Sequence, residues 1–558
     1  MMDTLGVREY SGATVYPTIR VGTLPDRLLM GVFDADGSYI ERTALERRSG
    51  EVGAPAPREI FPAPRPAGDR GAIYGGTLYF HFGHFLLESL ARLWHAADEP
   101  NMPVVWAGSH SWEGKEFEPW QLEILQILGV RNELRILSAP ETFERLVIPD
   151  VGYRYDDWFH PQHAEFLGRY VGPPQETGRK IWLSRTGMSN GVKDVNAPAV
   201  ERRLAAEGWA ITYPERSSVR AQLDEISRAS VIAGEEGSAF HALMLLQDVS
   251  GKRFEIIKRH GMEHRNLHTI GDARSVRQRF HTNREAKLLF AEGRRVAKIS
   301  PNASSVLDAL EVPVREVPMS GREQDLALGV AAIADAANAS SLVEIGSRFP
   351  LLALVNAPHR VIVSSELRPD PRQFPGLACY ETDLESYLAY FSGLPDPTGA
   401  SAESPAPALT PADVIVLASD AIDAALEAFE RSGCLSHSRT VWVFTGDVDH
   451  TAVAARLASR APGAWAVGAR VNPTMLVAAA ALPEPKALTR LRSCGIGIVP
   501  VVDPRTAIRA LRVDVTAVER PVVAATVAHA RKSLAQAARV IAGLALRTLF
   551  RVIAHLRR

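Results

Sequence analysis

Residues 229–246 read ASVIAGEEGSAFHALMLL, which is the pattern of a short apolar strand, a tight turn and an apolar helix. Gly237 and Ser238 open the helix, and the backbone N–H groups of a first helical turn have no partner within the helix. A diphosphate could bind there, while Glu235 or Glu236 bonds ribose or sugar hydroxyls. Because one such turn is a weak signal, the stretches around it must decide the fold.

Strands and helices alternate from residue 71 to about residue 290. The helices are expected at 84–97, 119–128, 198–207, 219–229 and 238–246. The strands are expected at 102–108, 145–149, 180–185, 209–214, 230–237 and 253–258. Alternation of this kind predicts an α/β fold in which helices cover parallel sheets.

A second α/β series starts near residue 300, with strands SLVEIG, RVIVSSE, DVIVLAS, TVWVFTG, AWAVGA and IGIVPVV and a Pro- and Ala-rich loop at 394–413. Before residue 71, short alternating runs around the turn DADG at 34–37 indicate a hairpin. The expected domains are a β-rich segment at 1–70, α/β units at 71–175, 176–295 and 300–515, and a terminal helix at 520–558.

The composition indicates a globular protein of the cytoplasm. Of 558 residues, 46% are hydrophobic and the formal net charge is -1, which leaves no basic excess for nucleic acid. The three cysteines are widely separated, which argues against a disulfide scaffold or a zinc ribbon. We find no signal peptide at the N-terminus and no uncharged run long enough to cross a bilayer.

The segment 525–558 is a basic amphipathic helix by its pattern, with arginines on one face and leucine, isoleucine and valine on the other. No aspartate or glutamate follows Glu519. Such a helix either lies in the headgroup layer of an anionic membrane, which would place the protein peripherally on the inner face of the cell membrane, or docks on the protein's own core.

A second informative stretch is HFGHFLLESLARLW at 81–94. On a regular helix His81, His84, Glu88 and Arg92 share one face. The stripe could hold a metal, although it lacks the glutamate that zincins place between two histidines. It could be a buried polar network, or the wall of a cleft in which His84 or Glu88 takes a proton from a hydroxyl while others bond sugar hydroxyls.

A third stretch, KIWLSRTGMSNGVKDVN at 180–196, delivers Arg185 to the end of a strand, where ligands bind in open α/β sheets. A guanidinium there suits a phosphate, although an ordinary surface arginine is the alternative. Lys193 and Asn196 add polar groups at the same end.

Taken in order, these stretches resemble the family 61 glycosyltransferases over about residues 20–270. The residues that carry the resemblance are GHFLLESLARLW at 83–94, Ser184 with Arg185 and Asn196, the strand end at Glu215, and AGEEGSAFHALML at 233–245. The chain departs from many members at Glu236, where they have a histidine, and at Ala242, where asparagine is common.

The resemblance implies a GT-B fold, with two Rossmann-like halves and inversion at the anomeric carbon without an obligatory metal or cofactor. It implies a nucleotide-sugar donor and a glycan or lipid-linked acceptor of surface or capsular polysaccharide synthesis. Carried over by position, His84 and Glu88 belong to the acceptor wall, and Arg185, Asn196, Glu215 and Gly237 belong to the donor side. From the residues themselves we add His81 and Arg92 to the acceptor side, and Lys193, Glu235, Glu236 and Ser238 to the donor side. Arg92, one helical turn from Glu88, is expected to fix that carboxylate. A non-catalytic glycan-binding scaffold is the alternative.

The run LVEIGSRFPLLALVNAPHRVIVSSE at 342–366 is similar to the first two motifs of a class I methyltransferase, with Glu366 twenty residues after Gly346. Only one glycine stands in the turn, and Arg348 and Phe349 replace small residues. The unit is therefore a degenerate Rossmann-like accessory domain, a live methyltransferase in a bifunctional protein, or an unrelated α/β domain.

Overall fold

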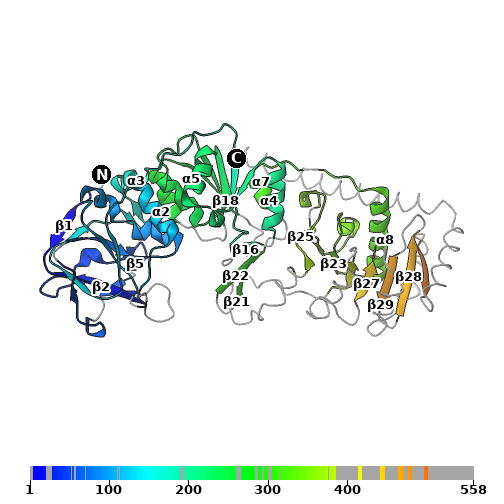
Figure 1. The fold of residues 1–558 in the computed structure, drawn as a ribbon. Coiled ribbons are helices and arrows are strands. Elements are labelled where there is room, and N and C mark those ends of the chain that lie inside the picture. The colour runs from blue at the N-terminus through cyan, green and yellow to red at the C-terminus, as the bar shows by residue number, and fades with distance from the viewer. Residues whose placement is uncertain are drawn as a thin grey trace, which may run out of the picture. The chain divides into compact units, whose positions relative to one another are not determined.

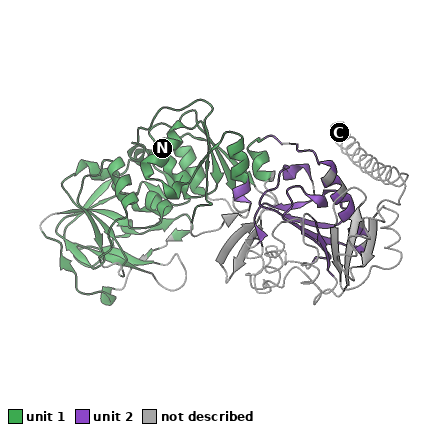
Figure 2. Ribbon diagram, turned by 45° about the vertical axis from the view of Figure 1, so that its right-hand side comes forward, with its two compact units in different colours: residues 1–193, 200–286, 305–312 green, residues 194–199, 287–304, 313–558 purple. Residues whose placement is uncertain are grey.

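The computed structural model describes most of residues 4–387, with short gaps that include 21–27, 189–192, 259–264, 283–286 and 300–303. Beyond these it describes 412–417, 440–445, 463–469, 475–479 and 496–500. The chain forms two compact units (Figure 2). Unit 1 holds residues 1–193, 200–286 and 305–312, and unit 2 holds 194–199, 287–304 and 313–558.

The first sheet of unit 1 has the strand order β1-β12-β8-β9-β10 (Figure 1). Its strands are β1 (Val7–Tyr10), β8 (Ala72–Thr77), β9 (Val104–Ala107), β10 (Leu134–Leu137) and β12 (Leu146–Pro149). All are parallel except β1, which pairs antiparallel with β12 at the edge. The chain moves from β8 to β9 and β10 on one side and later returns to place β12 on the other.

The strands of the predicted β-rich segment 1–70 form sheets together with strands from the segment that follows it. A second sheet has the order β6-β3-β2-β11-β7. Its strands are β2 (Ala13–Arg20), β3 (Leu28–Phe33), β6 (Gly53–Pro55), β7 (Arg65–Pro66) and β11 (Glu141–Phe143). The predicted turn at 34–37 is present, since the N–H of Asp34 donates to the carbonyl of Ser38 at 3.0 Å.

A third sheet of unit 1 is fully parallel, with the order β17-β15-β18-β19-β20. Its strands are β15 (Lys180–Leu183), β17 (Ala210–Thr212), β18 (Val231–Glu235), β19 (Arg253–Lys258) and β20 (Arg277–Thr282). Its helices are α4 (Ala197–Ala206), α5 (Val219–Arg228), α6 (Arg265–Ala273) and the 3₁₀ helix η6 (Ser238–Leu245). These elements confirm the predicted α/β alternation.

The shorter elements of unit 1 connect these layers. They are η1 (Glu41–Thr43), β4 (Glu46–Arg47), β5 (Gly50–Glu51), η2 (Arg58–Ile60), α2 (Pro119–Ile127), β13 (Tyr153–Arg154), β14 (Trp158–Phe159), α3 (Pro161–Leu167), β16 (Lys193–Asp194), η5 (Pro214–Arg216) and α7 (Ser304–Ala309).

The predicted helix 84–97 is broken into three kinds of turn. α1 (Phe82–His84) runs into the π-helical turn η3 (Phe85–Ser89), and a 3₁₀ helix η4 (Leu93–Asp98) follows. The carbonyl of Ser89 accepts from the indole of Trp106 at 2.8 Å, and that of Ala91 accepts from the N–H of Gly152. A regular helix would have used both carbonyls itself, so these tertiary contacts favour the break.

One hydrophobic core joins the first and third sheets of unit 1. It includes Phe85 and Leu90 from the broken helix together with Phe240 and Phe254 from the third sheet and its covering helix. A polar contact adds to it, since the carboxylate of Glu123 on α2 accepts from the N–H groups of Val219 and Arg220 at 2.7 and 3.1 Å. These are the first N–H groups of α5, which its own turn cannot satisfy.

Unit 2 contains one mixed sheet with the order β25-β24-β23-β26-β27-β29-β28-β30. Its strands are β23 (Ser341–Ile345), β24 (His359–Val363), β25 (Ala378–Tyr380), β26 (Val414–Leu417), β27 (Val441–Phe444), β28 (Gly463–Ala469), β29 (Met475–Ala479) and β30 (Ile496–Pro500). Beside them are α8 (Gly321–Ala337), η7 (Leu351–Leu354), η8 (Pro371–Gln373) and the hairpin of β21 (Lys287–Ala291) and β22 (Arg294–Ile299). All six predicted strands are present.

The turn after β23 carries Arg348 and Phe349 in place of small residues. Phe349 is only 5% exposed and packs edge-on against Phe374, with ring centroids 5.7 Å apart. Glu366, the acid expected to hold a ribose, forms an ion pair with Arg348 at 3.0 Å. The buried Glu344 accepts from the N–H groups of Leu351 and Leu352, and burial raises its pKa to about 7. Phe349 and Glu344 thus serve the fold at this turn, whereas the pair of Arg348 and Glu366 is exposed.

No helix among the described residues is both long and apolar enough to cross a membrane. The loop 394–413, except its last two residues, and the predicted amphipathic helix 525–558 lie outside the described residues.

We expect Glu123→Ala to lower the free energy of unfolding by about 1–3 kcal/mol, because two N–H groups of α5 lose a charged acceptor. Urea unfolding measures this, with the exposed Gln126→Ala on the same helix as the matched control. Equal losses of unfolding free energy in Glu123→Ala and Gln126→Ala would show that the contact between Glu123 and α5 does not stabilise the fold.

We also expect S-adenosylmethionine to leave the melting temperature of the full chain unchanged, because Phe349 and Arg348 occupy the turn. A dose-dependent rise in the melting temperature would instead support the methyltransferase interpretation.

Candidate functional site

The centre of the candidate site is the carboxylate of Glu88, which lies on the π-helical turn and is 8% exposed. Arg47 donates to it twice, from Nε at 2.8 Å and from Nη2 at 3.1 Å. The third contact is His84, whose Nδ1 lies 2.6 Å from Oε2 of Glu88. A buried carboxylate needs such partners, because an uncompensated charge in the interior is costly.

These partners also set the charge of Glu88. Burial by itself would raise its pKa, but the hydrogen bonds from His84 and Arg47 and the charge of Arg47 outweigh burial. The pKa of Glu88 therefore lies below its ordinary value. Glu88 is ionised at neutral pH and is a weak base there.

His84 has the accessible nitrogen of the pair. Its side chain is 29% exposed and lies between two aromatic rings, with centroids 5.2 Å from Tyr79 and 5.4 Å from Tyr155. When Nδ1–H donates to a carboxylate, Nε2 carries the lone pair. None of the described residues hydrogen-bonds Nε2, so the imidazole can accept a proton from outside the pair.

A strained turn places Tyr155 against His84. Asp156 follows it with φ of 60°, in the left-handed region, between β13 and β14. Asn266 of α6 holds this turn by accepting from Tyr153 Oη at 2.6 Å and from the N–H of Asp156 at 2.7 Å. Arg47 lies over the ring of Tyr155 at 4.9 Å. The aromatic support of His84 thus depends on α6 of the third sheet.

The start of α1 packs against the turn after β18. A Cβ atom added to Gly83 would lie 3.0 Å from Cβ of Ser238 and 3.1 Å from Nδ1 of His241, so only glycine permits this approach without a shift. Arg185 reaches the same turn, because a Cβ on Gly237 would lie 2.6 Å from its Nη1. The structure therefore brings together three of the stretches singled out by sequence.

His81 lies between these groups, exposed at the start of α1, with its ring 5.3 Å from that of His84. Partial desolvation lowers the pKa of His81, and the charges of His84 and Arg185 lower it further. A neutral imidazole is the expected form at neutral pH.

Sequence reasoning missed the residues that hold the loop of Arg185. Glu201 on α4 is 7% exposed and accepts from Ser184 Oγ at 2.5 Å, from Thr186 Oγ1 and from Tyr213 Oη at 3.2 Å. Ser184 and Thr186 flank Arg185, so Glu201 fixes the backbone that carries the guanidinium. The only local signal in the sequence was the pair of hydroxyl side chains, Ser184 and Thr186, on either side of Arg185.

The other predicted donor residues have the following positions. Glu215 lies in η5 beside Gly187, where an added Cβ would meet its Oε1 at 1.9 Å. Glu235 ends β18, and Glu236 is buried at 3% exposure. Lys193 lies in β16, but its side chain is outside the described residues. The donor-binding roles of these residues stay predictions.

Asn196 belongs to unit 2, where its amide donates to the carbonyl of Cys379 at 3.3 Å and accepts from the N–H of Glu381 at 2.9 Å. The side chain is 1% exposed, so both of its polar atoms serve the fold. A donor-binding role for Asn196 has no structural support and stays a prediction.

Arg92 does not fix Glu88, the role for which the sequence spacing made it a candidate; Arg47 does. The side chain of Arg92 is buried and donates to the carbonyls of Pro149 and Arg42, and burial lowers its pKa to about 10. The π-helical turn explains the error, because one extra residue per turn rotates everything beyond it by roughly 100°.

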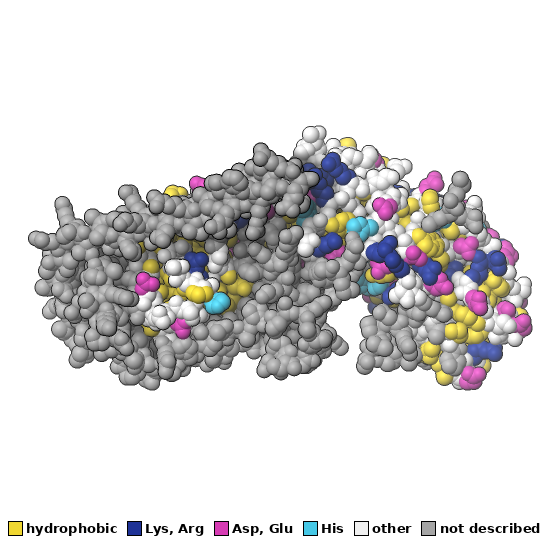
Figure 3. Space-filling model, turned by 180° about the vertical axis from the view of Figure 1, so that it is seen from behind, with side chains coloured by type: hydrophobic (Ala, Val, Ile, Leu, Met, Phe, Trp, Pro, Cys, Tyr) yellow, Lys and Arg dark blue, Asp and Glu magenta, His cyan; other side chains and the backbone are white. Residues whose placement is uncertain are grey.

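Within the described part of the chain, no group of three or more histidine, cysteine, aspartate or glutamate side chains is arranged to hold a metal ion. Basic and acidic side chains are mixed across the face of unit 1 seen in Figure 3, in agreement with the net charge of -1.

Glu88 with its paired imidazole and Arg185 beside the start of η6 are the main polar groups of the candidate site. Residues 82–251, which contain all three, match the family model described as Glycosyltransferase 61. The resemblance predicted from the sequence is therefore confirmed over residues 82–251 of the chain. No curated protein matches the chain.

We expect Glu88→Gln to destabilise the fold by about 3 kcal/mol at pH 7, because Arg47 loses the charge that compensates it. The folded-state pKa of Glu88 lies below the unfolded value of about 4.3, so the ionised group contributes stability above that pH. This contribution is lost as the pH falls through the lowered folded value. The difference between the native chain and the variant should therefore shrink in acid.

Urea unfolding at pH 7 and at about pH 3.5 measures both effects. Glu141→Gln, which breaks the more exposed pair with Arg135, is the control and should cost less than about 1 kcal/mol. A pH-independent difference for Glu88→Gln would contradict the assignment of an ionised carboxylate.

Proposed function

We propose that the protein transfers a sugar from a nucleotide-sugar donor to a hydroxyl of a glycan or lipid-linked acceptor, with inversion and without a metal or other cofactor. His84 is the base and Glu88 orients it. The observation that carries this proposal is the 2.6 Å contact between His84 Nδ1 and Glu88 on a helix whose start packs against the turn of Gly237 and Arg185.

The proposed reaction is a single displacement. The acceptor oxygen attacks the anomeric carbon as its proton passes to Nε2 of His84, and the bond from that carbon to the diphosphate oxygen breaks. The imidazolium that forms is stabilised by ionised Glu88, which stays deprotonated. The proton later leaves to water, which restores the neutral imidazole.

Positive groups meet the charge that develops on the leaving diphosphate. Arg185 Nη1 lies beside Gly237, and the N–H groups at the start of η6 have no acceptor within the helix. A guanidinium and a helix start together suit a diphosphate oxygen. Glu201 supports this arrangement as a positioning residue, because it fixes Ser184 and Thr186 on either side of Arg185.

The first and third sheets of unit 1 serve in this proposal as the acceptor and donor halves of a GT-B enzyme, since each is a parallel sheet with helices and both contribute to one core. Family resemblance supports a role in surface or capsular polysaccharide synthesis. We place the reaction at the cytoplasmic side of the membrane, with segment 525–558 as a peripheral contact to anionic lipid.

We expect His84→Asn to lower kcat for sugar transfer by roughly 10²- to 10⁴-fold with little change in donor affinity, because only proton removal is lost. Release of nucleoside diphosphate from a panel of nucleotide sugars measures this. His95→Asn is the matched control, since His95 is also paired with a carboxylate, Asp98, at 3.1 Å.

In the same assay Arg185→Ala should weaken donor binding, whereas Arg179→Gln, at the opposite end of the same strand, should not. A native chain that binds no nucleotide sugar would refute the enzyme function and favour a glycan-binding scaffold.

A further inference from the structure

The first sheet of unit 1 has a topological switch point between β8 and β12. From β8 the chain proceeds to β9 and β10 on one side, and β12 is added on the other side. Ligands of open α/β sheets bind at the carboxyl ends of neighbouring strands beside such a point. The pairing of β8 with β9 shifts register between Tyr74 and Gly76, close to the carboxyl end of β8.

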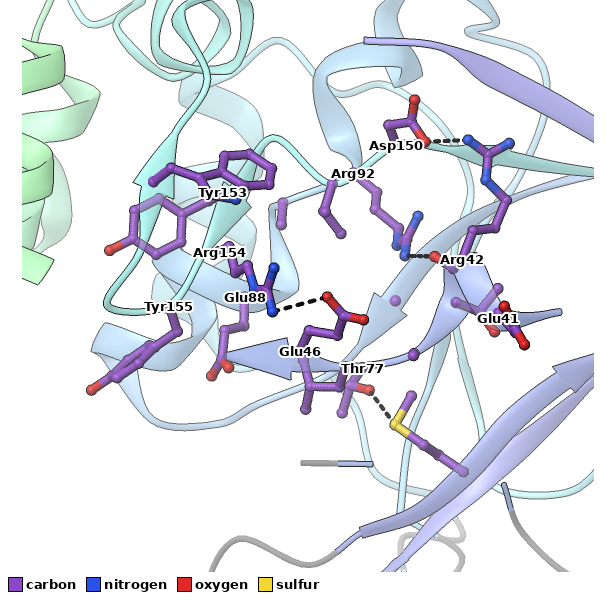
Figure 4. A pocket seen from close by; sticks show the side chains of 18 residues that line it. Glu41, Arg42, Glu46, Thr77, Glu88, Arg92, Asp150, Tyr153, Arg154 and Tyr155 are labelled. Carbon is purple, nitrogen blue, oxygen red and sulfur yellow. Dashed lines mark hydrogen bonds and ion pairs between the residues drawn. The ribbon is translucent and has the colours of Figure 1, made fainter. Parts of the chain in front are cut away.

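A pocket of about 220 Å³ lies at the carboxyl ends of β8 and β12 (Figure 4). Gly76 and Thr77 contribute from the end of β8, and Asp150 and Val151 from the end of β12. The loop 41–46 covers it from the N-terminal segment, which lies outside the matched residues 82–251. In Figure 4, Glu88 and Tyr155 lie on one side of the pocket, and Arg92, Arg42 and Asp150 lie on the other.

Most charged side chains of the pocket, Glu41 and Arg92 excepted, are paired with a group of opposite charge. Arg42 pairs with Asp150, and Arg154 pairs with Glu46 at 3.2 Å. Arg92 donates to two backbone carbonyls, and Glu88 is paired with Arg47. An anionic ligand would compete with the carboxylates that already pair with Arg42 and Arg154. An uncharged ligand with several hydroxyls can instead accept from the arginines and donate to the carboxylates.

The size and the aromatic lining of the pocket further restrict the kind of ligand that it can bind. The volume is below the 300–1,000 Å³ typical of sites for drug-sized ligands, so it suits a single small ring. Trp158 is partly exposed and lines the pocket, where its ring can cover the apolar face of a sugar. Polar edges and one aromatic surface are complementary to a pyranose.

We propose that this pocket is an acceptor subsite that binds one uncharged sugar ring. Glu88 and Tyr155 line the pocket, and both contact His84. A sugar ring bound in the pocket is therefore one side chain away from the imidazole of His84. The ring in the pocket is therefore the neighbour of the sugar that reacts, and the acceptor is a glycan of at least two sugars. The role of the pocket as an acceptor subsite rests on the proposed function, whereas the binding of a sugar ring to the pocket does not.

The test is saturation-transfer NMR on the full chain with methyl glycosides of neutral hexoses and N-acetylhexosamines, and with methyl glucuronide as the anionic probe. We expect at least one neutral glycoside to bind the native chain. Trp158→Ala and Arg154→Gln should each weaken that binding roughly fivefold or more. Arg135→Gln is the matched control, because Arg135 is 29% exposed and paired with Glu141, as Arg154 is 31% exposed and paired with Glu46.

Three results would overturn the inference: no binding of any neutral glycoside, unchanged binding in both pocket variants, or binding of the glucuronide alone. Circular dichroism melts of the variants exclude loss of fold as the cause of weaker binding. A chain that binds neutral glycosides through Trp158 but binds no nucleotide sugar would refute the proposed function and leave the subsite in place.

Discussion

The arrangement of the site depends on one constraint, the burial of the Glu88 carboxylate. A carboxylate at 8% exposure persists in its ionised form only when its oxygens are satisfied, and three hydrogen bonds do so here. Arg47 supplies two of them from the hairpin of β4 and β5, outside the matched segment. The N-terminal residues are thus part of the site's electrostatics as well as of its fold.

The same carboxylate connects elements that are distant in the sequence. Arg47 reaches Glu88 and also covers Tyr155, Tyr155 supports His84, and Asn266 holds the turn that carries Tyr155. Each contact restricts the orientation of the His84 imidazole, because the short helical turn that carries it does little to fix the ring. A general base benefits from this restriction, because its nitrogen must lie within hydrogen-bond reach of the hydroxyl it deprotonates.

The sequence predicts the layers well and the site only in part. Apolar strands such as β15 and β18 are recognisable because parallel strands are buried on both faces. The approach of Arg185 to Gly237 follows from the neighbouring strands β15 and β18, which end at one edge of the third sheet. Arg47 could not be found, since it contacts Glu88 from 41 residues away along the chain. For Glu201, 17 residues from Ser184, only its partners on either side of Arg185 gave a local signal. Arg92 was misjudged because periodicity assumes a regular helix, whereas tertiary bonds to the carbonyls of Ser89 and Ala91 favour a π turn.

In the proposed function, acceptor and donor groups occupy different places because they lie at the ends of different sheets, the first and the third of unit 1. Parallel strands release their carboxyl ends at one edge, so each sheet offers one region for ligands. In the first sheet that region is the pocket between β8 and β12, and in the third it is the group of turns that carry Arg185, Glu215 and Gly237. The start of α1 connects the two regions, because Gly83 touches Ser238 while Glu88, five residues later, lines the pocket. In the proposed function the base lies between two substrates, and His84 is on the element that connects these two regions.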